Sequence, residues 1–218
     1  MSGLYDKELN FSFYSENSKI NLKSNGNKRL TILLAGFAYD LTMPIFYYVN
    51  KLLENKESDI LQIDFGYSKN QDFIKLSESE QDKIFDKDVS NLQEYIESLD
   101  YEELMFIGKS LGTSACYKLL HSENIYHRTK GAIWLTPGTS AYQISKFISK
   151  NDINNLLIYG DNDKYKNDLD MTALSQSSFN LNLISIENAN HSLESNNCVE
   201  SINILKYVIE KINIFIKN

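Results

Sequence analysis

Residues 103–120 read ELMFIGKSLGTSACYKLL, with Gly108-Lys109-Ser110-Leu111-Gly112 at their centre. The apolar run before Gly108 predicts a buried strand, and the residues after Ser110 predict a helix that begins at once. A serine at such a sharp turn is held in strained backbone geometry, with its hydroxyl exposed at the helix N-terminus. A side chain at either glycine would collide with the neighbouring strand or helix. The stretch therefore predicts a nucleophile at Ser110, and a turn serine that caps the helix is the alternative.

The rest of the chain alternates between short apolar runs and amphipathic segments. The predicted strands are residues 30–35, 59–65, 103–108, 131–138, 154–160 and 179–188. The predicted helices are residues 42–56, 77–99, 111–121, 141–150, 165–177 and 198–216. This alternation predicts an α/β fold with a mostly parallel central sheet and helices on both of its faces. In such sheets, ligands bind beyond the carboxyl ends of the strands.

The N-terminal segment, residues 1–28, alternates only weakly between apolar and polar residues. Its stretches 9–15 and 19–24 predict one or two short strands at an edge of the sheet. Nothing in the sequence resembles a linker between domains. We therefore expect a single domain over residues 1–218, with residues 1–28 supplying the edge strands.

The composition limits the classes of partner. Of the 218 residues, 42% are hydrophobic, which is enough for a full core, and the net charge is −7. A negative chain is poorly suited to nucleic acid or to an anionic membrane surface, so we expect neither as a partner. The acidic residues are scattered along the chain, as is typical of a solvated surface.

The use of cysteine indicates a reducing compartment, and the hydropathy indicates neither a signal peptide nor a membrane span. Cys116 and Cys198 form neither a Cys-x-x-Cys pair nor a zinc pattern with histidine, so the sequence predicts no metal site. Residues 1–19 contain no apolar stretch of signal-peptide length. No run approaches the roughly 20 apolar residues of a membrane span. We expect a cytoplasmic protein.

The pentapeptide around Ser110 resembles the nucleophile elbow of the α/β-hydrolases. That family orders its catalytic triad as serine, then acid, then histidine. A matching acid lies in Gly160-Asp161-Asn162-Asp163, which resembles the family's turn and indicates Asp163, with Asp161 as the alternative. A matching histidine, His191, follows the last predicted strand. The segment between Ser110 and Asp163 is too short for the lid domain that many relatives insert there.

The other histidines and the cysteines fit this resemblance less well. His121 and His127 are predicted near the end of the helix after Ser110, on the far side of the sheet from the expected site. Neither cysteine has a histidine in a suitable place, so both are expected to be core or helix residues. His191 is the remaining candidate for the base.

The resemblance also implies an oxyanion hole made of two backbone N–H groups. Leu111, next to the nucleophile, would supply one. Phe37 would supply the other from the loop after the first buried strand, where the family often has His-Gly and this chain has Ala35-Gly36. Because the donor is a backbone group, loss of the family histidine need not abolish the hole. Loss of one such donor costs roughly 3 to 4 kcal/mol of transition-state stabilisation.

Three further residues are candidates for contact with substrate. Gly36 lies in the oxyanion loop, and Tyr39 follows it closely enough to touch an acyl group. Lys109 could line the mouth of the site, although an exposed, solvated lysine is the more common outcome at such a position. Core packing is the alternative for Tyr39.

The resemblance implies a serine hydrolase that cleaves a small-molecule ester or thioester through an acyl-enzyme on Ser110, without metal or organic cofactor. The compact size is similar to that of dienelactone hydrolases and acyl thioesterases. A dienelactone hydrolase would be expected to use cysteine, so the serine favours ester chemistry. Two alternatives stay open: a non-catalytic binding protein with this fold, and a peptide or carbon–carbon bond hydrolase with the same triad. The sequence leaves the oligomeric state open.

Overall fold

The structure is a computed structural model that describes residues 5–6, 12–54, 56–177 and 180–217. A single sheet runs through these residues in the order β1-β2-β4-β3-β5-β6-β7-β8. Its strands are β1 Tyr5–Asp6, β2 Lys19–Ser24, β3 Arg29–Leu34, β4 Asp59–Asp64, β5 Glu103–Lys109, β6 Thr129–Leu135, β7 Asn154–Gly160 and β8 Leu181–Ile186. β2 pairs antiparallel with β1 and β4, whereas all the pairs from β4 to β8 are parallel. The mostly parallel sheet is as predicted.

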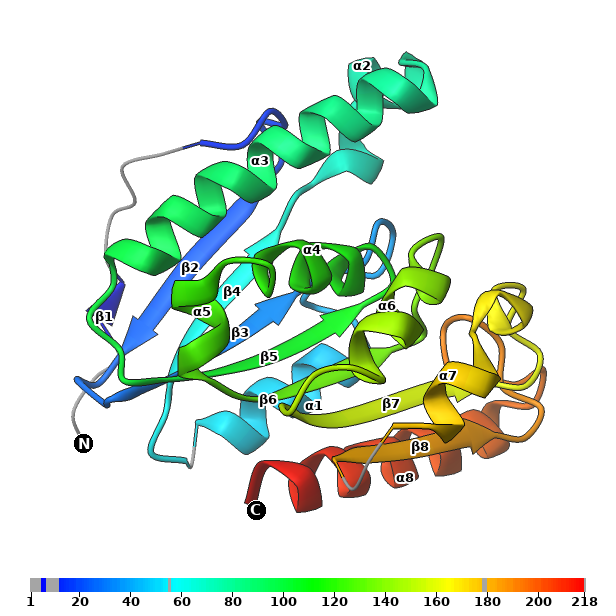
Figure 1. Cartoon of the computed structure of the whole chain (residues 1–218). Coiled ribbons are helices and arrows are strands. Elements are labelled where there is room, and N and C mark those ends of the chain that lie inside the picture. The colour runs from blue at the N-terminus through cyan, green and yellow to red at the C-terminus, as the bar shows by residue number, and fades with distance from the viewer. Residues whose placement is uncertain (1–4, 7–11, 55, 178–179, 218) are drawn as a thin grey trace.

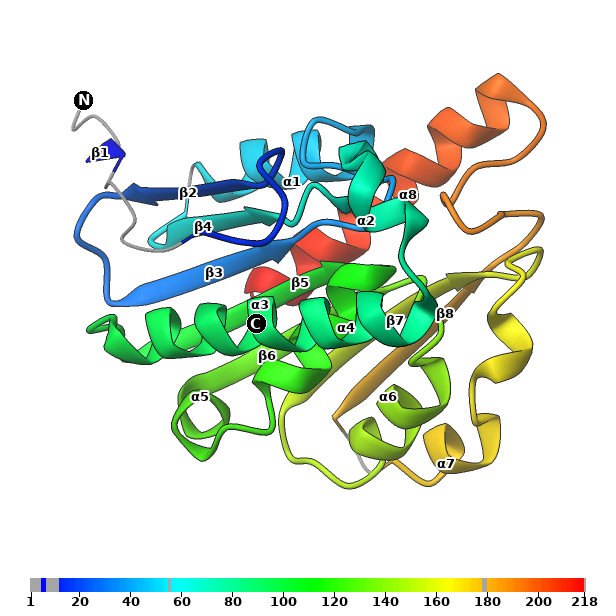
Figure 2. The same cartoon turned by 90° about the horizontal axis from the view of Figure 1, so that it is seen from above.

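Helices cover both faces of the sheet (Figures 1 and 2). α1 Pro44–Leu53 and α8 Cys198–Lys217 pack together on one face. The other face carries α3 Glu78–Ser98, α4 Leu111–Leu119, α5 Glu123–Arg128, α6 Ala141–Ile148 and α7 Met171–Ser175. The short α2 Gln71–Lys75 precedes α3, and 3-10 turns η1 and η2 occupy Tyr67–Lys69 and Lys166–Asp168. Within residues 129–160, β6 connects to β7 through α6 alone, so no lid domain interrupts the sheet there.

Two apolar cores, one on each face, explain why the strands read as continuous apolar runs. Successive residues of a strand point to opposite faces. In β3, Ile32 and Leu34 therefore join the core under α3 and α4, whereas Leu33 joins the core under α1 and α8. In β5, Phe106 and Ile107 divide in the same way. A strand buried on both faces has no polar side to display.

Several predicted elements differ in extent from those in the structure. The helix predicted over 165–177 is replaced by η2 and the five-residue α7, whose N-cap Asp170 accepts a hydrogen bond from Ala173 N. The strand predicted over 131–138 ends at Leu135, because Thr136 has a φ of 45° that no strand residue adopts. In the edge segment, β2 forms as predicted, but residues 12–15 form no strand and 9–11 lie outside the described residues.

In the part of the chain that the structure describes, no helix is both long and apolar enough to cross a bilayer.

Candidate active site

Ser110 lies at the sharp turn between β5 and α4, at the carboxyl edge of the sheet. Its backbone has φ 50° and ψ −115°, outside the regions that residues other than glycine favour. Such strain persists only where the surroundings impose it, and it is common at functional sites. Here Ser110 N donates to Leu135 O at 3.0 Å, and Thr113 Oγ1 donates to Ser110 O at 2.6 Å. The turn therefore holds the serine hydroxyl at the N-terminus of α4.

The two glycines of the turn allow the helix to approach the sheet. A Cβ on Gly108 would lie 2.6 Å from Gly112 O, and one on Gly112 would lie 2.0 Å from Leu34 O. Both distances are too short for real carbon atoms, and the atoms met are backbone atoms that cannot rotate away. The predicted steric reason for the Gly-x-Ser-x-Gly pattern is confirmed.

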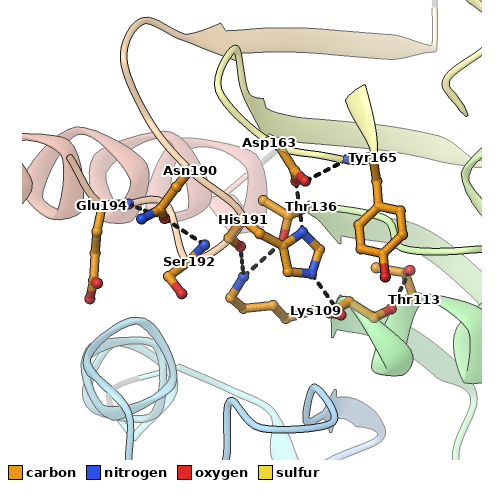
Figure 3. Close-up of polar contacts among 10 residues, drawn as sticks. Lys109, Thr113, Thr136, Asp163, Tyr165, Asn190, His191, Ser192 and Glu194 are labelled. Carbon is orange, nitrogen blue, oxygen red and sulfur yellow. Dashed lines mark hydrogen bonds and ion pairs between the residues drawn. The ribbon is translucent and has the colours of Figure 1, made fainter. Parts of the chain in front are cut away.

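The structure brings Ser110, His191 and Asp163 into one hydrogen-bonded relay. His191 Nε2 lies 2.8 Å from Ser110 Oγ, and His191 Nδ1 lies 2.8 Å from Asp163 Oδ2. Figure 3 shows the imidazole between the Asp163 carboxylate and the end of β5. Each residue follows a different strand: β5, β7 and β8. In the tautomer that suits both neighbours, Nδ1–H donates to the carboxylate and Nε2 accepts from the hydroxyl.

The turn after β7 and the loop after β8 pack closely, which sets the distance from Asp163 to His191. A Cβ on Gly160 would lie 2.0 Å from Ala189 O, so only glycine allows this approach. Asn162 N donates to Ala189 O at 2.9 Å across the same contact. The histidine loop is also braced internally, because Asn190 Oδ1 accepts from Ser192 N at 2.8 Å (Figure 3).

Asp163, and not Asp161, contacts the histidine. The Asp163 side chain is 2% exposed, and its Oδ1 accepts from Tyr165 N at 2.9 Å. Burial alone would raise the pKa of Asp163, but the hydrogen bonds from His191 and Tyr165 N, with the nearby charge of Lys109, bring it below its ordinary value. The carboxylate thus stays ionised and available to His191. Oδ1 of Asp161 is buried and has no hydrogen-bond partner among the described residues.

The other two histidines lie on other elements. His121 follows α4 and its Nδ1 lies 2.8 Å from Tyr117 O, whereas His127 lies on the separate helix α5, beside Tyr126. His191 remains partly accessible, with 27% of its side chain exposed. The ring of Tyr165 meets its imidazole edge-on, with centroids 5.1 Å apart.

A pocket of about 470 Å³ opens beside the serine. Its lining residues are Phe37, Tyr67, Phe73, Glu78, Gln81, Asp82, Phe85, Ser110, Leu111, Ser114, Gly138, Thr139 and Tyr165. Leu111 and Phe37, whose N–H groups were predicted to form the oxyanion hole, thus border the same cavity as Ser110. Neither N–H donates a hydrogen bond to any other described residue.

Much of the pocket wall was not predicted from the sequence. The connection from β4 to α3 supplies Tyr67 and Phe73, whose rings stack at 4.0 Å with an angle of 4° between planes. Phe37 lies 6.5 Å from Phe73 between ring centroids and closes the same wall. The density of aromatic residues in 65–85 is the sequence signal for this wall, although it gives no direction for the side chains.

The three predicted substrate contacts take different places. Gly36 lies against the elbow, where a Cβ would come within 3.2 Å of Lys109 O and 3.4 Å of Ser110 Cβ. Tyr39 is 7% exposed, does not line this pocket, and its hydroxyl accepts from Ile45 N at 3.1 Å. Burial raises the pKa of Tyr39 to about 12, which matches a packed phenol.

The expectation of an exposed Lys109 is wrong. The residue is 1% exposed and does not line the pocket beside Ser110. It alternates with Ser110 at the end of β5, so its side chain leaves on the opposite side, where Tyr39 and Thr136 enclose it. No group of three or more His, Cys, Asp or Glu side chains in the described residues could hold a metal ion.

Solved structures that are similar to this chain identify its fold. No protein-family model matches the sequence, and no curated protein matches it either. Dienelactone hydrolase from Anabaena variabilis is 16% identical, with a TM-score of 0.65 over 98% of this chain and 97% of that chain. Alpha/beta hydrolase domain-containing protein 10 from mouse is 10% identical, with a TM-score of 0.64 over 98% of each chain.

A third solved structure is Est1E from Butyrivibrio proteoclasticus with ferulic acid bound. It is 17% identical, with a TM-score of 0.59 over 89% of this chain and 95% of that chain. These similarities extend over 89–98% of this chain and 95–98% of the similar proteins. The chain therefore has the α/β-hydrolase fold.

Proposed function

We propose that this protein is a serine hydrolase that cleaves a carboxylic ester or thioester through an acyl-enzyme on Ser110. The observation that carries the proposal is the relay from Asp163 through His191 to Ser110, with both links at 2.8 Å. A serine hydroxyl is a weak nucleophile until a base in hydrogen-bond reach can take its proton. A turn serine that only caps a helix needs neither that base nor a buried carboxylate behind it.

In the first half of the reaction, Ser110 Oγ attacks the substrate carbonyl carbon while its proton passes to His191 Nε2. The carbonyl π electrons move to the oxygen, and the Leu111 and Phe37 N–H groups stabilise the resulting oxyanion. Asp163 holds the tautomer of His191 and stabilises its cation without taking the proton. When the intermediate collapses, the bond to the leaving alcohol or thiol breaks, and His191 returns the proton to that group. Ser110 is left acylated.

In the second half, water takes the place of the alcohol or thiol. His191 removes a proton from the water as its oxygen attacks the acyl carbon, and the oxyanion forms again at the same two donors. Collapse breaks the bond to Ser110 Oγ, which regains its proton from His191. The carboxylic acid leaves, and the net reaction adds one water across the ester or thioester.

The pocket supports a substrate with an apolar acyl group. Phe37, Phe73 and Tyr165 give it aromatic walls, and rings of this kind favour apolar and planar groups. The similar Butyrivibrio protein was solved with ferulic acid, an aromatic carboxylic acid. The partner expected from this chemistry is a small ester or thioester.

Labelling with a fluorophosphonate probe tests the proposal. The probe phosphonylates an activated serine, and mass spectrometry locates the adduct. We expect an adduct on Ser110 in the wild type and none in Ser110→Ala or His191→Ala, followed by turnover of ester and thioester substrates graded by acyl length. Folded protein that takes no label would instead indicate a binding protein, and higher rates on amides or diketones would indicate the other bond types.

A further inference from the structure

Lys109 is a buried lysine with a complete set of partners. Its Nζ donates to Thr136 Oγ1 at 2.7 Å and to the backbone oxygen of His191 at 2.6 Å (Figure 3). Nζ also lies 4.7 Å from the centre of the Tyr39 ring. A lysine is almost never fully buried unless it is paired, because desolvation of the ammonium is costly. The hydroxyl, the carbonyl and the aromatic face together offset that cost.

The contact with His191 links the turn that carries Ser110 to the loop that carries His191, and the distance between these two segments must stay fixed. Lys109 directly precedes Ser110 in the chain, and its side chain ends on the backbone of the residue that supplies the base. Between described residues, no other side chain donates a hydrogen bond to His191 O. Ser110 and His191 are 81 residues apart, so this contact fixes a distance that local chain geometry does not set.

The charged and titratable groups around Nζ come from three loops. Tyr39 faces it from the loop before α1, Asp163 from the turn after β7, and His191 and Glu194 from the loop after β8. Burial lowers the pKa of Lys109 to about 7, against the opposing pull of the Asp163 and Glu194 charges. Both the ammonium and the neutral amine have enough N–H groups for Thr136 and His191, so the two hydrogen bonds do not depend on the charge.

We propose that Lys109 is a positioning residue that holds the His191 backbone so that the imidazole meets Ser110 Oγ. It acts through His191 and does not touch the substrate. The proposal rests on the proposed function only for its kinetic consequence, because the placement of His191 can be measured without any reaction.

The test compares Lys109→Met, which keeps the length and apolar bulk, with the matched control Lys130→Met, an exposed lysine on β6. The first measurement is the downfield proton resonance of His191 Nδ1–H, assigned by its loss in His191→Ala. We expect it to be kept in the control and lost or strongly shifted in folded Lys109→Met. The second is the rate constant for fluorophosphonate labelling, which we expect to fall roughly 10- to 100-fold, since small misplacements of catalytic groups cost this much.

The resonance separates positioning from general damage to the fold. A Lys109→Met protein that keeps its other resolved resonances but loses that of His191 Nδ1–H has misplaced this residue alone. If the mutant is labelled as fast as wild type and its resonance is unchanged, the inference is wrong.

Thr136 provides a second route if Lys109→Met does not fold. Thr136→Val removes one acceptor of Nζ with little change of shape, and Thr136→Ser keeps the hydroxyl. We expect Thr136→Val to lose labelling rate by roughly three- to tenfold and Thr136→Ser to match wild type. Equal rates in all three proteins would overturn the proposal. A wild type that takes no label while its resonance responds to Lys109→Met would contradict the proposed hydrolase and leave the positioning role supported.

Discussion

At the scale of single residues, Asp161 and Asp163 are two positions apart and have different surroundings. Only Asp163 meets the imidazole, at 2.8 Å. In Asp163→Asn the amide can present its N–H to Nδ1 and favour the wrong tautomer of His191. We expect the labelling rate of Ser110 to fall roughly 10³- to 10⁴-fold, as for other triads that lose their acid. The measurement is the rate constant for fluorophosphonate labelling at neutral pH.

Asp161→Asn is the matched control for that substitution. It makes the same chemical change two residues earlier, at a carboxylate whose buried Oδ1 has no hydrogen-bond partner among the described residues. We expect a rate close to wild type. A large loss in Asp161→Asn together with a small one in Asp163→Asn would reverse the assignment of the acid.

The buried amine of Lys109 predicts how stability changes with pH. Its pKa is about 7 in the folded protein and returns to its ordinary value of 10.5 on unfolding. Between these values the unfolded chain binds a proton that the folded chain does not, so the free energy of unfolding rises with pH. The contribution is present above the unfolded pKa and is lost as pH falls toward 7. Compared with Lys109→Met, wild type should gain stability from about pH 7 to about pH 10.

Urea unfolding of both proteins across this range checks the sign. Other titrating groups are shared by the two proteins and largely cancel in the difference. A difference that stays flat would show that Lys109 keeps an ordinary pKa in the fold, and one that falls as pH rises would show that its pKa is raised there.

At the scale of elements, the approach of α4 to β3 depends on the absence of one methyl group. In Gly112→Ala the new Cβ would lie 2.0 Å from Leu34 O, so helix and strand must separate. We expect a loss of about 3 kcal/mol in the free energy of unfolding, which is typical of severe overpacking. Gly138→Ala is the control, because its nearest atom would be Ser110 Oγ at an ordinary 3.7 Å. Chemical denaturation measures both, and equal losses would contradict this reason for the glycine.

Long periodic segments were predictable from the sequence, and short ones were not. The helix predicted over 77–99 is α3, because four of its apolar positions repeat at helical spacing and Ser77 with Glu80 forms a capping box. α2 and α7 have five residues each, too few for a periodic pattern. Their caps, Asn70 and Asp170, are typical of turns as well as of helix starts.

Those parts of the site whose positions depend on the order of the strands were predictable from the sequence. Those that depend on the direction of a side chain were not. The resemblance to the α/β-hydrolases indicated Ser110, Asp163 and His191, and parallel strands, which align their carboxyl ends, bring the three residues to one edge of the sheet. The burial of Lys109 could not be predicted, because a long side chain beside a turn can reach either solvent or the core. Which of the two it reaches depends on the residues that other segments place around it. The partner that decides this, Thr136, has a positive φ that nothing in its local sequence indicates.

At the scale of the whole molecule, the pocket beside Ser110 combines segments that are far apart in the sequence. The loop after β3, the connection from β4 to α3, the turn between β5 and α4 and the turn after β7 each supply part of its lining. Acyl specificity should therefore change independently of the triad. Phe73 suits a test, because it is buried against Tyr67, lines the pocket and is no part of the relay from Asp163 to Ser110.

Phe73→Ala should remove part of the aromatic wall and leave the relay intact. For 4-nitrophenyl esters, we expect kcat/KM with a phenylpropanoyl group to fall roughly tenfold relative to acetyl, since a lost apolar contact of this size costs 1–3 kcal/mol. The ratio within one variant cancels any loss of active protein, and Ile74→Ala, on the exposed side of α2, controls for the substitution itself. A ratio unchanged from wild type would mean that the acyl group binds elsewhere. In that case the leaving group would be the part of the substrate that this pocket holds.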